Sequence, residues 1–304
     1  MIIGRRTAWD LPASEITPER FVLGRKIGRR KLVAGTLALS AMPGLARAAI
    51  YDPGRPITPE KDATTYNNYY EFGEDKDIWQ AAQALPQRPW SITFDGLVEK
   101  NQTFALDDLL KMVTLEDRAY RHRCVEAWAM TVPWRGFPLT RLVAIAKPLA
   151  SAKYVQFQSD ADNKNMPGLS DPSFPWPYTE AVTIEEAANV LPFIATGLYG
   201  KPLPPQNGGP IRLVLPWKYG FKSGKALVRV TFTDKRPDTL WATLNSDEYG
   251  FWANVNPAVP HPRWSQAQER LLGTDQLVPT RIYNGYGDQV ASLYSNLQNE
   301  NLFR

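Results

Sequence analysis

Cys124 is the only cysteine in 304 residues, and it lies in the run that decides the fold assignment, Tyr120-Arg121-His122-Arg123-Cys124-Val125-Glu126-Ala127-Trp128-Ala129-Met130. A single thiol cannot form an internal disulfide, so Cys124 is a small buried hydrophobe, an intermolecular bridge, a nucleophile or a metal ligand. Its position alone favours the core residue, because free cysteine is among the most buried residue types. Arg121 and Arg123 flank it, however, and nearby cations lower a thiol pKa and favour the thiolate that attacks or ligates.

Residues 1–48 contain the three parts of an export signal in their usual order. A basic segment ends in Arg29-Arg30-Lys31, a short apolar stretch follows over 32–42, and Ala46-Arg47-Ala48 forms a small-x-small cleavage site. The apolar stretch is too short to span a bilayer. The pattern resembles a twin-arginine signal, whose substrates cross the membrane folded and often carry a cofactor already. We therefore expect residues 1–48 to be removed and the protein to be periplasmic.

The charge of the chain is concentrated in this leader. Residues 1–48 carry nine Lys and Arg against three acids, a net charge of +6, whereas the whole chain carries +4. The remaining residues therefore carry −2. The sequence pI of about 9.0 is consequently no argument for nucleic-acid binding, and we expect no nucleic-acid partner.

The rest of the chain predicts one domain, 49–304, of class α+β with several short sheets and long loops. The 26 Pro and 20 Gly of the whole chain suit a loop-rich fold, and the length of the domain allows a sizeable core. No stretch after the leader approaches the ~20 apolar residues of a membrane span. Local patterns predict a hairpin within 90–98 that turns at Asp95-Gly96 and strands at 153–159 and 191–196. They also predict helices at 103–112, at 140–146 and after the cap Thr183, a turn at 134–139 and a loop at 66–73.

A second informative segment combines a Gly/Pro/Asn loop with cations. It runs from Tyr199 to Lys225 and includes Pro204-Pro205-Gln206-Asn207-Gly208, Arg212 and the turn Ser223-Gly224-Lys225. Backbone amides and nearby cations could hold an anion such as a phosphate, although a solvated turn between strands is an equally good interpretation. The segment is not a Walker loop, because the G-x-x-x-x-G-K-[ST] spacing is absent.

Several other classes of site are excluded by the motifs. Two histidines and one cysteine are too few for a zinc cage, and a c-type haem would need C-x-x-C-H. Neither G-x-S-x-G nor G-x-G-x-x-G occurs, so the sequence predicts neither a serine hydrolase elbow nor a dinucleotide fingerprint.

Five blocks together resemble a known family, the catalytic subunits of periplasmic protein-methionine-sulfoxide reductases. These are molybdenum enzymes with the sulfite-oxidase-type, molybdopterin-binding fold. The resemblance runs from the leader to about Leu293 and rests on Tyr66-Asn67-Asn68-Tyr69-Tyr70-Glu71-Phe72, Arg123-Cys124-Val125-Glu126-Ala127-Trp128, the Pro204–Gly208 block with Arg212, Pro216-Trp217-Lys218-Tyr219-Gly220-Phe221-Lys222 and Glu248-Tyr249-Gly250-Phe251-Trp252.

The resemblance implies one Mo-molybdopterin per chain and a set of residues that hold it. Cys124 becomes the protein thiolate on molybdenum, a soft ligand, and is thereby both the catalytic and the metal residue. The resemblance implies that molybdopterin is contacted by Asn67, Tyr70, Glu71, Ser159, Asn207, Arg212, Ser223, Gly224 and Lys225. Ser159 stands where the family has threonine and keeps the hydroxyl, and His122 stands where the family has methionine.

The resemblance also implies the reaction and its partners. The reaction would be reduction of methionine sulfoxide in oxidised periplasmic proteins by oxygen-atom transfer to molybdenum, which repairs them. Because the chain has no haem motif, electrons would come from a membrane haem-binding electron-donor subunit of the MsrQ/YedZ type that draws on quinols or a flavin reductase. Apart from that heterodimer, the mature protein is expected to be monomeric.

Two other functions remain as alternatives. One is a sulfite-oxidising molybdenum enzyme of the same fold, against which the loop at 66–72 and the aromatic block at 217–221 argue. The other is an exported, cofactor-free binding module in which Cys124 is only a buried side chain. Molybdenum content distinguishes this module from the two enzymes.

Overall fold

The alternating run at 153–159 forms a strand, as predicted, in the computed structural model, which describes residues 53–304. This strand, β5 (Tyr154–Ser159), buries alternate side chains, including Ser159 at its end. It belongs to a five-stranded sheet of order β2-β1-β10-β5-β6, in which β1 and β10 are parallel and the other neighbours antiparallel. The other strands are β1 (Ser91–Gly96), β2 (Gln102–Ala105), β6 (Thr179–Thr183) and β10 (Leu227–Thr233). The predicted leader, residues 1–48, lies outside the described residues.

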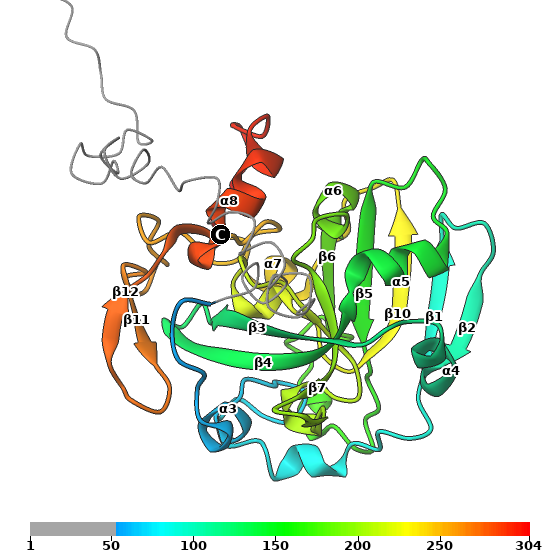
Figure 1. The fold of residues 1–304 in the computed structure, drawn as a ribbon, viewed down its shortest axis with the longest axis horizontal. Coiled ribbons are helices and arrows are strands. Elements are labelled where there is room, and N and C mark those ends of the chain that lie inside the picture. Colours follow the sequence, from blue (N-terminus) through cyan, green and yellow to red (C-terminus); the bar gives the residue numbers. More distant parts are fainter. Residues whose placement is uncertain (1–52) are drawn as a thin grey trace, which may run out of the picture. The chain divides into compact units, whose positions relative to one another are not determined.

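The second sheet is built around a long hairpin of β3 (Glu116–Arg123) and β4 (Trp128–Pro138), which carries Cys124 at its tip. Its main order is β12-β11-β4-β7-β8, with β3 also paired to β4 and β9 to β7. In Figure 1 this hairpin lies between the five-stranded sheet and the β11–β12 pair. The remaining strands are β7 (Phe193–Leu198), β8 (Lys201–Pro202), β9 (Arg212–Val214), β11 (Gln268–Leu271) and β12 (Leu277–Pro279).

The helices are short and lie at the ends of strands and in the loops. The longest, α5 (Leu139–Ala146), is the predicted amphipathic run, and α6 (Ile184–Ala187) begins with the predicted cap, in which Thr183 and Glu186 form a capping box. None in residues 53–304 combines the length and apolarity that a bilayer span requires. The others are α3 (Glu60–Thr65), α4 (Leu106–Lys111), α7 (Leu240–Leu244) and α8 (Gly287–Val290), with 3-10 turns at Ala81–Ala84, Pro167–Ser170, Pro205–Asn207, Gly220–Lys222, Ile282–Gly285 and Ala291–Tyr294. The predicted α+β class is confirmed, and its short strands join into two sheets.

Two local predictions were wrong because strand pairing overrides the local pattern. The expected helix at 103–112 begins only at Leu106, since Thr103 lies in β2 with its hydroxyl 3.0 Å from that of Thr93 on β1. The expected turn at 134–139 falls largely in β4, which pairs with β7 here. Gly136 marks a close approach of strands instead of a turn, because a Cβ there would lie 2.0 Å from the Ile194 carbonyl oxygen.

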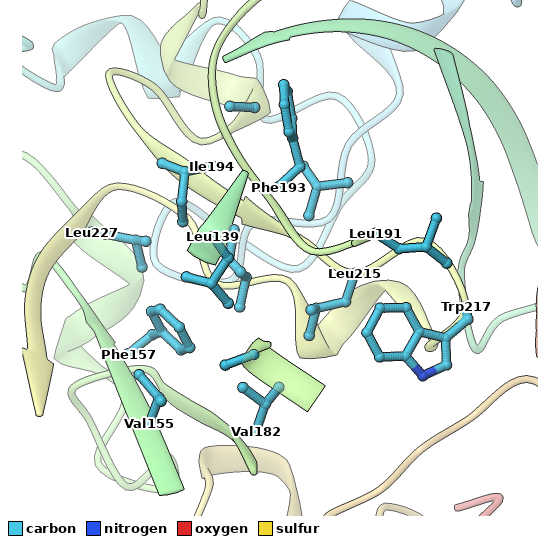
Figure 2. Packing of buried hydrophobic residues seen from close by; sticks show 14 of the residues in the cluster. Leu139, Val155, Phe157, Val182, Leu191, Phe193, Ile194, Leu215, Trp217 and Leu227 are labelled. Atoms are coloured by element: carbon cyan, nitrogen blue, oxygen red, sulfur yellow. The ribbon is translucent and has the colours of Figure 1, made fainter. Parts of the chain in front are cut away.

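The main core lies between the two sheets. Figure 2 shows Val155 and Phe157 of β5 together with Phe193 and Ile194 of β7, which belong to different sheets. Each of these four side chains is at most 1% exposed, and burying one such side chain contributes roughly 1.5–3 kcal/mol. Leu139, at the start of α5, is fully buried in the same core. The core therefore sets the position of the second sheet, and of the Cys124 hairpin, relative to the first.

A second, smaller core anchors the loop at 66–73, which was correctly expected to have no regular helix or strand. Tyr69 and Phe72 from this loop pack with Ile78, Leu85 and Met166. Because Tyr69 and Phe72 point into this core, the neighbouring positions of the loop remain available to face elsewhere. This small core is therefore what positions Asn67, Tyr70 and Glu71.

A fully buried ion pair ties the segment after β9 to α6. Lys218 Nζ lies 2.5 Å from Glu186 Oε1, and both side chains are 1% exposed. Lys218 also donates to the Trp252 carbonyl and to Asn254 Oδ1, at 2.7 and 2.9 Å. Glu186 Oε1 accepts a further hydrogen bond from the Tyr294 hydroxyl at 2.6 Å. Removing one charge of such a pair leaves the other buried without compensation.

We predict that Glu186→Gln lowers the free energy of unfolding by about 3–5 kcal/mol, because the Lys218 ammonium loses its counter-charge. Urea unfolding of the cofactor-free protein measures this without a contribution from ligand binding. The matched control is Glu60→Gln, which removes the exposed pair with Lys201 and should change stability very little. A loss no larger than that of the control would contradict the prediction.

Candidate active site

One cavity brings together most of the residues that the sequence singled out. It contains about 740 Å³ of empty space, part of it open to solvent. Asn67, Tyr70, Glu71, Cys124, Asn207, Arg212 and Lys225 all line it. Ser159, Ser223 and Gly224 do not line it, although each is buried. The cavity thus joins three segments far apart in the sequence: the 66–73 loop, the β3–β4 hairpin and the segment from 206 to 225.

Cys124 lies in a tight turn between the two strands of the hairpin. Its N–H donates to the Trp128 carbonyl at 2.9 Å, and its carbonyl accepts from the N–H of Ala127 at 3.1 Å. Ala127 has a φ of +64°, a left-handed conformation that is unfavourable for a residue with a Cβ. Such a conformation persists only where surrounding contacts enforce it.

Those contacts come from a segment almost 140 residues downstream. The Val125 carbonyl accepts hydrogen bonds from Trp264 Nε1 and Gln266 Nε2, both at 2.8 Å. The Ala127 carbonyl accepts from the N–H of Arg270 at 2.9 Å. The backbone of the turn is therefore clamped from behind, and the Cys124 thiol is presented to the cavity from a rigid support.

Arg123 is part of the same clamp. Its side chain is fully buried, with Nε 3.1 Å from Glu269 Oε2 and Nη2 2.8 Å from Gln266 Oε1. A third donor, Nη1, bonds to the Cys124 carbonyl. Glu269 also binds the guanidinium of Arg55, so one buried carboxylate joins two arginines behind the cysteine.

The Cys124 pKa is not lowered overall, as the flanking arginines led us to expect, because burial outweighs them. Arg123 does act to lower it, although Arg123 is itself paired with Glu269, and Arg121 Nε donates at 2.6 Å to the Pro53 carbonyl. Burial, and secondarily the Glu126 carboxylate, raises the pKa of the thiol to about 12. The free thiol is therefore neutral at pH 7, and a thiolate here requires a cation such as a metal ion to stabilise it.

Three residues that the sequence analysis did not assign to the site form a hydrogen-bonded group next to the sulfur. Asn68 Nδ2 lies 3.4 Å from Cys124 Sγ and 3.1 Å from Glu126 Oε2. Lys76 Nζ pairs with Glu126 at 2.9 Å. Burial acts to raise the pKa of Glu126, but hydrogen bonds from Lys76, Asn68 and Trp128 hold it below its usual range. The one sequence signal for Asn68 was its position beside Asn67 in the amide-rich loop.

Asn67 and Asn207 are oriented by a single backbone carbonyl. The Nδ2 atoms of both donate to the carbonyl of Ala63, at 3.3 and 2.9 Å. A carbonyl only accepts, so the two amide oxygens must be on the other side. Both Oδ1 atoms are buried and have no hydrogen-bond partner among the described residues. An unsatisfied buried acceptor is costly, and two of them together call for a ligand with N–H or O–H donors.

The same cavity holds two cations, Arg212, which is buried, and Lys225, which is half-buried. Arg212 donates to the carbonyls of Asn207, Leu213 and Ser223 at 2.9–3.2 Å. Lys225 Nζ lies over the ring of Tyr69 at 4.9 Å. Within residues 53–304, neither cation has a carboxylate within 4.0 Å. Burial lowers the pKa of Arg212 to about 10, and burial with Arg212 nearby lowers that of Lys225 to about 8.

Two further titratable groups take up their uncharged forms readily. Burial raises the pKa of Glu71 to about 7, although Lys225 opposes the shift. Burial, followed by the nearby charges of Arg212 and Lys225, lowers the pKa of His122 to about 3. His122 is therefore neutral at pH 7. This part of the cavity is electropositive and suits an anionic ligand.

The Ser223-Gly224-Lys225 turn is held in place by Gly208. The N–H of Ala226 donates to the Gly208 carbonyl at 2.9 Å. Gly208 has a φ of +92°, and a Cβ there would lie 2.7 Å from Lys225 Cβ, so only glycine fits. Among the described residues, the N–H groups of Gly224 and Lys225 make no hydrogen bond. The turn is buried, which makes the solvated-turn interpretation wrong and leaves two backbone donors beside the cations.

Comparisons with known proteins give a consistent result. The family model "Oxidoreductase molybdopterin binding domain" matches residues 80–241. The chain is 45% identical to the protein-methionine-sulfoxide reductase catalytic subunit MsrP of Ralstonia nicotianae, over 97% of this chain and 96% of that protein. Identity and coverage are the same for MsrP of Burkholderia mallei. A solved structure, sulfane dehydrogenase SoxCD from Paracoccus pantotrophus, matches 50% of this chain and 40% of its own at 21% identity and a TM-score of 0.42.

The residues of the cavity fit a molybdopterin. This group carries ring N–H and amino donors, a phosphate and a pair of sulfurs that hold the metal. The unsatisfied oxygens of Asn67 and Asn207 match the donors, and Arg212, Lys225 and the free N–H groups of the turn match the phosphate. Ser159 Oγ is a further buried atom without a partner among the described residues. Cys124 supplies a soft sulfur ligand.

We predict that Lys225→Met stabilises the cofactor-free protein by about 1–3 kcal/mol, because it removes a half-buried cation that forms no ion pair among the described residues and whose charged form is disfavoured by desolvation and by Arg212. The same change should lower molybdenum content at least tenfold, since a charged hydrogen bond of roughly 1.5–3 kcal/mol is lost. Urea unfolding and metal analysis give the two measurements, and exposed Lys235→Met is the control that should leave both unchanged.

The pH dependence follows from the lowered pKa of Lys225. Below about 8, its value in the folded protein, the ammonium is buried and its cost is fully present. Between about 8 and the ordinary value of 10.5, the unfolded chain binds more protons than the folded chain, so wild-type stability rises relative to the variant. The stability gap between the two proteins should therefore close over this range, and a gap independent of pH would contradict the assignment.

Proposed function

We propose that this chain, which belongs to the family of protein-methionine-sulfoxide reductase catalytic subunits, reduces methionine sulfoxide in oxidised periplasmic proteins and so repairs them. Family membership makes it a molybdenum-dependent oxidoreductase with a molybdopterin-binding domain of the sulfite-oxidase type. One Mo-molybdopterin would occupy each chain. When bound, it supplies two-electron oxygen-atom transfer, in which sulfoxide, two electrons and two protons give a thioether and water.

The observation that carries the proposal is the match between the two walls of the cavity. One wall presents a single rigid thiol, and the other presents unsatisfied acceptors and unpaired cations. The high pKa of Cys124 disfavours a free thiolate nucleophile, whereas metal coordination displaces the proton and keeps the sulfur in place. Cys124 would therefore act as a metal ligand.

The residues around the sulfur adjust its properties. Asn68 and the N–H of Glu126 lie 3.4 and 3.5 Å from Cys124 Sγ as donors, and donors to a ligating sulfur tune the metal centre. Glu126 is held ionised, so at neutral pH its carboxylate orients Asn68 and Trp128. An ionised carboxylate has no proton to supply, which favours water as the proton source.

The electrons would come from outside the chain. The sequence contains no C-x-x-C-H motif, so we propose a membrane haem-binding electron-donor subunit of the MsrQ/YedZ type as the partner. The substrates would be oxidised periplasmic proteins, and the mature protein would otherwise be monomeric. Export by the twin-arginine route would deliver it folded, with the cofactor already in place.

The central test is turnover of a methionine-sulfoxide-containing protein with reduced benzyl viologen as electron donor. We predict that wild-type protein is active and that Cys124→Ser, at equal folded concentration, loses activity by at least 10³-fold because the metal loses its soft protein ligand.

The outcome also separates the alternative functions. Metal-loaded wild type that oxidises sulfite but reduces no sulfoxide would place the chain in the sulfite-oxidising branch. Protein exported normally but containing no molybdenum would indicate a cofactor-free binding module. Full activity of Cys124→Ser would refute the role of the thiolate.

Export has a separate test in the leader. We predict that Arg29→Lys with Arg30→Lys retains the full-length protein in the cytoplasm, because the twin-arginine signal is read through both guanidinium groups. Cell fractionation followed by molybdenum analysis measures this, and Arg5→Lys with Arg6→Lys is the matched control. Unchanged periplasmic protein in the first variant would rule out this route.

A further inference from the structure

A row of aromatic side chains begins in the lining of the cavity and continues beyond it. Tyr70 and Trp241 line the cavity, with ring centroids 4.9 Å apart. Phe174 contacts both, at 5.7 and 6.0 Å, and Trp176 stacks on Phe174 at 5.0 Å with the planes 19° apart. Phe174 and Trp176 are half-buried and do not line the cavity. We call these two residues, which adjoin the lining residues Tyr70 and Trp241, the aromatic shelf.

The aromatic shelf is held in one conformation. Trp176 Nε1 donates to the Asp171 carbonyl at 3.1 Å, and the N–H of Trp176 donates to the Phe174 carbonyl at 2.9 Å. Behind it, Trp241 Nε1 donates to the Tyr178 hydroxyl at 3.1 Å. Rigid aromatic side chains offer contact area at little cost in conformational entropy when a partner binds. The long loop between β5 and β6 thus presents a preformed surface.

Two carboxylates near the cavity form ion pairs. Glu126 pairs with Lys76 at 2.9 Å, and Glu248, next to cavity-lining Tyr249, pairs with Arg263 at 2.7 Å. The side chains of the aromatic shelf, Phe174 and Trp176, carry no charge themselves, so a partner would contact the shelf through apolar groups.

We propose that Phe174 and Trp176 bind the apolar residues that flank an oxidised methionine in a substrate protein, and so determine which sulfoxides react. This inference rests on the proposed function. Because Phe174 and Trp176 present aromatic, uncharged surface, the neighbours of methionine that they would bind are apolar residues. In an extended segment those neighbours lie about 3.3–3.6 Å further along the chain per residue. When the sulfoxide enters the cavity, they come to lie along its edge, where the aromatic shelf is.

The test compares two peptides that share a central methionine sulfoxide and differ in its flanks, Val-Leu on both sides against Ser-Gly on both sides. Wild type should prefer the apolar peptide about tenfold in kcat/KM, a factor worth about 1.4 kcal/mol, through a lower KM at similar kcat. The double variant Phe174→Ala, Trp176→Ala should lose that preference while its kcat/KM for the Ser-Gly peptide and its molybdenum content stay unchanged.

Two further variants separate binding from stability. Phe104→Ala removes a half-buried aromatic that contacts Phe94 at 5.8 Å and lies outside the cavity lining, and it should keep the wild-type preference. The single variant Trp176→Ala should lower the preference for the apolar peptide to a value between those of wild type and the double variant. It replaces the double variant in the test if the latter folds poorly. Equal kcat/KM for both peptides in wild type, or an unchanged preference in the shelf variants, would overturn the proposal.

A binding measurement keeps this test independent of the reaction. Fluorescence anisotropy of labelled, unoxidised versions of both peptides on molybdenum-loaded protein, without electron donor, should show the same tenfold preference in Kd, lost in the double variant. If no sulfoxide is reduced but this binding preference is present, the proposed reaction is refuted and the proposed binding of apolar residues at the aromatic shelf is retained. Equal Kd values for the two peptides would refute binding of apolar residues at the aromatic shelf, whether or not the sulfoxides are reduced.

Discussion

The site depends above all on the hydrogen bonds that hold the Cys124 turn from behind. A hairpin tip is ordinarily the loosest part of a strand pair, and Ala127 adopts an unfavourable backbone conformation in this one. Here the carbonyls of the turn are bound by Trp264, Gln266 and Arg270, and Arg123 joins Cys124 to the buried carboxylate of Glu269. Since Arg55 binds the same carboxylate, residues near both ends of the described chain meet behind the cysteine. The thiol is thus fixed before any cofactor arrives, as a metal ligand needs to be.

The opposite wall of the cavity differs from the cysteine wall, because its polar groups are held in position but have no hydrogen-bond partners. The Ala63 carbonyl orients two amides whose oxygens have no partner among residues 53–304, and half-buried Lys225 makes no hydrogen bond or ion pair there. Buried groups of this kind lower the stability of the empty protein. They persist in natural proteins where a ligand compensates them. The small core around Tyr69 and Phe72 supports this wall as the hairpin clamp supports the other.

Much of the site could be predicted from the sequence, because its residues occur in distinctive blocks: the lone cysteine, the amide-rich loop and the Gly/Asn loop with cations. Seven of the residues so chosen line one cavity, whereas Ser159, Ser223 and Gly224 lie buried behind its lining. Asn68 was missed because nothing in the sequence shows which of two adjacent amides faces the sulfur. The net pKa of the thiol was wrongly predicted because burial, which outweighs the lowering by Arg123, cannot be seen in the sequence around Cys124.

The helices and strands also divide into those that could be predicted from the sequence and those that could not. Strand β5, helix α5 and the capping box of α6 were determined by the sequence itself, since their side-chain period or cap lies within a few residues. By contrast, Thr103 and Gly136 were misread, because both belong to strands whose partners lie elsewhere in the chain. The sequence alone thus determined the mixed class, the family and the chemical types at the site. Only the tertiary structure decided which charges are neutralised, which acceptors stay unpaired and how the cysteine is held, because each depends on burial and on contacts between segments far apart in the chain.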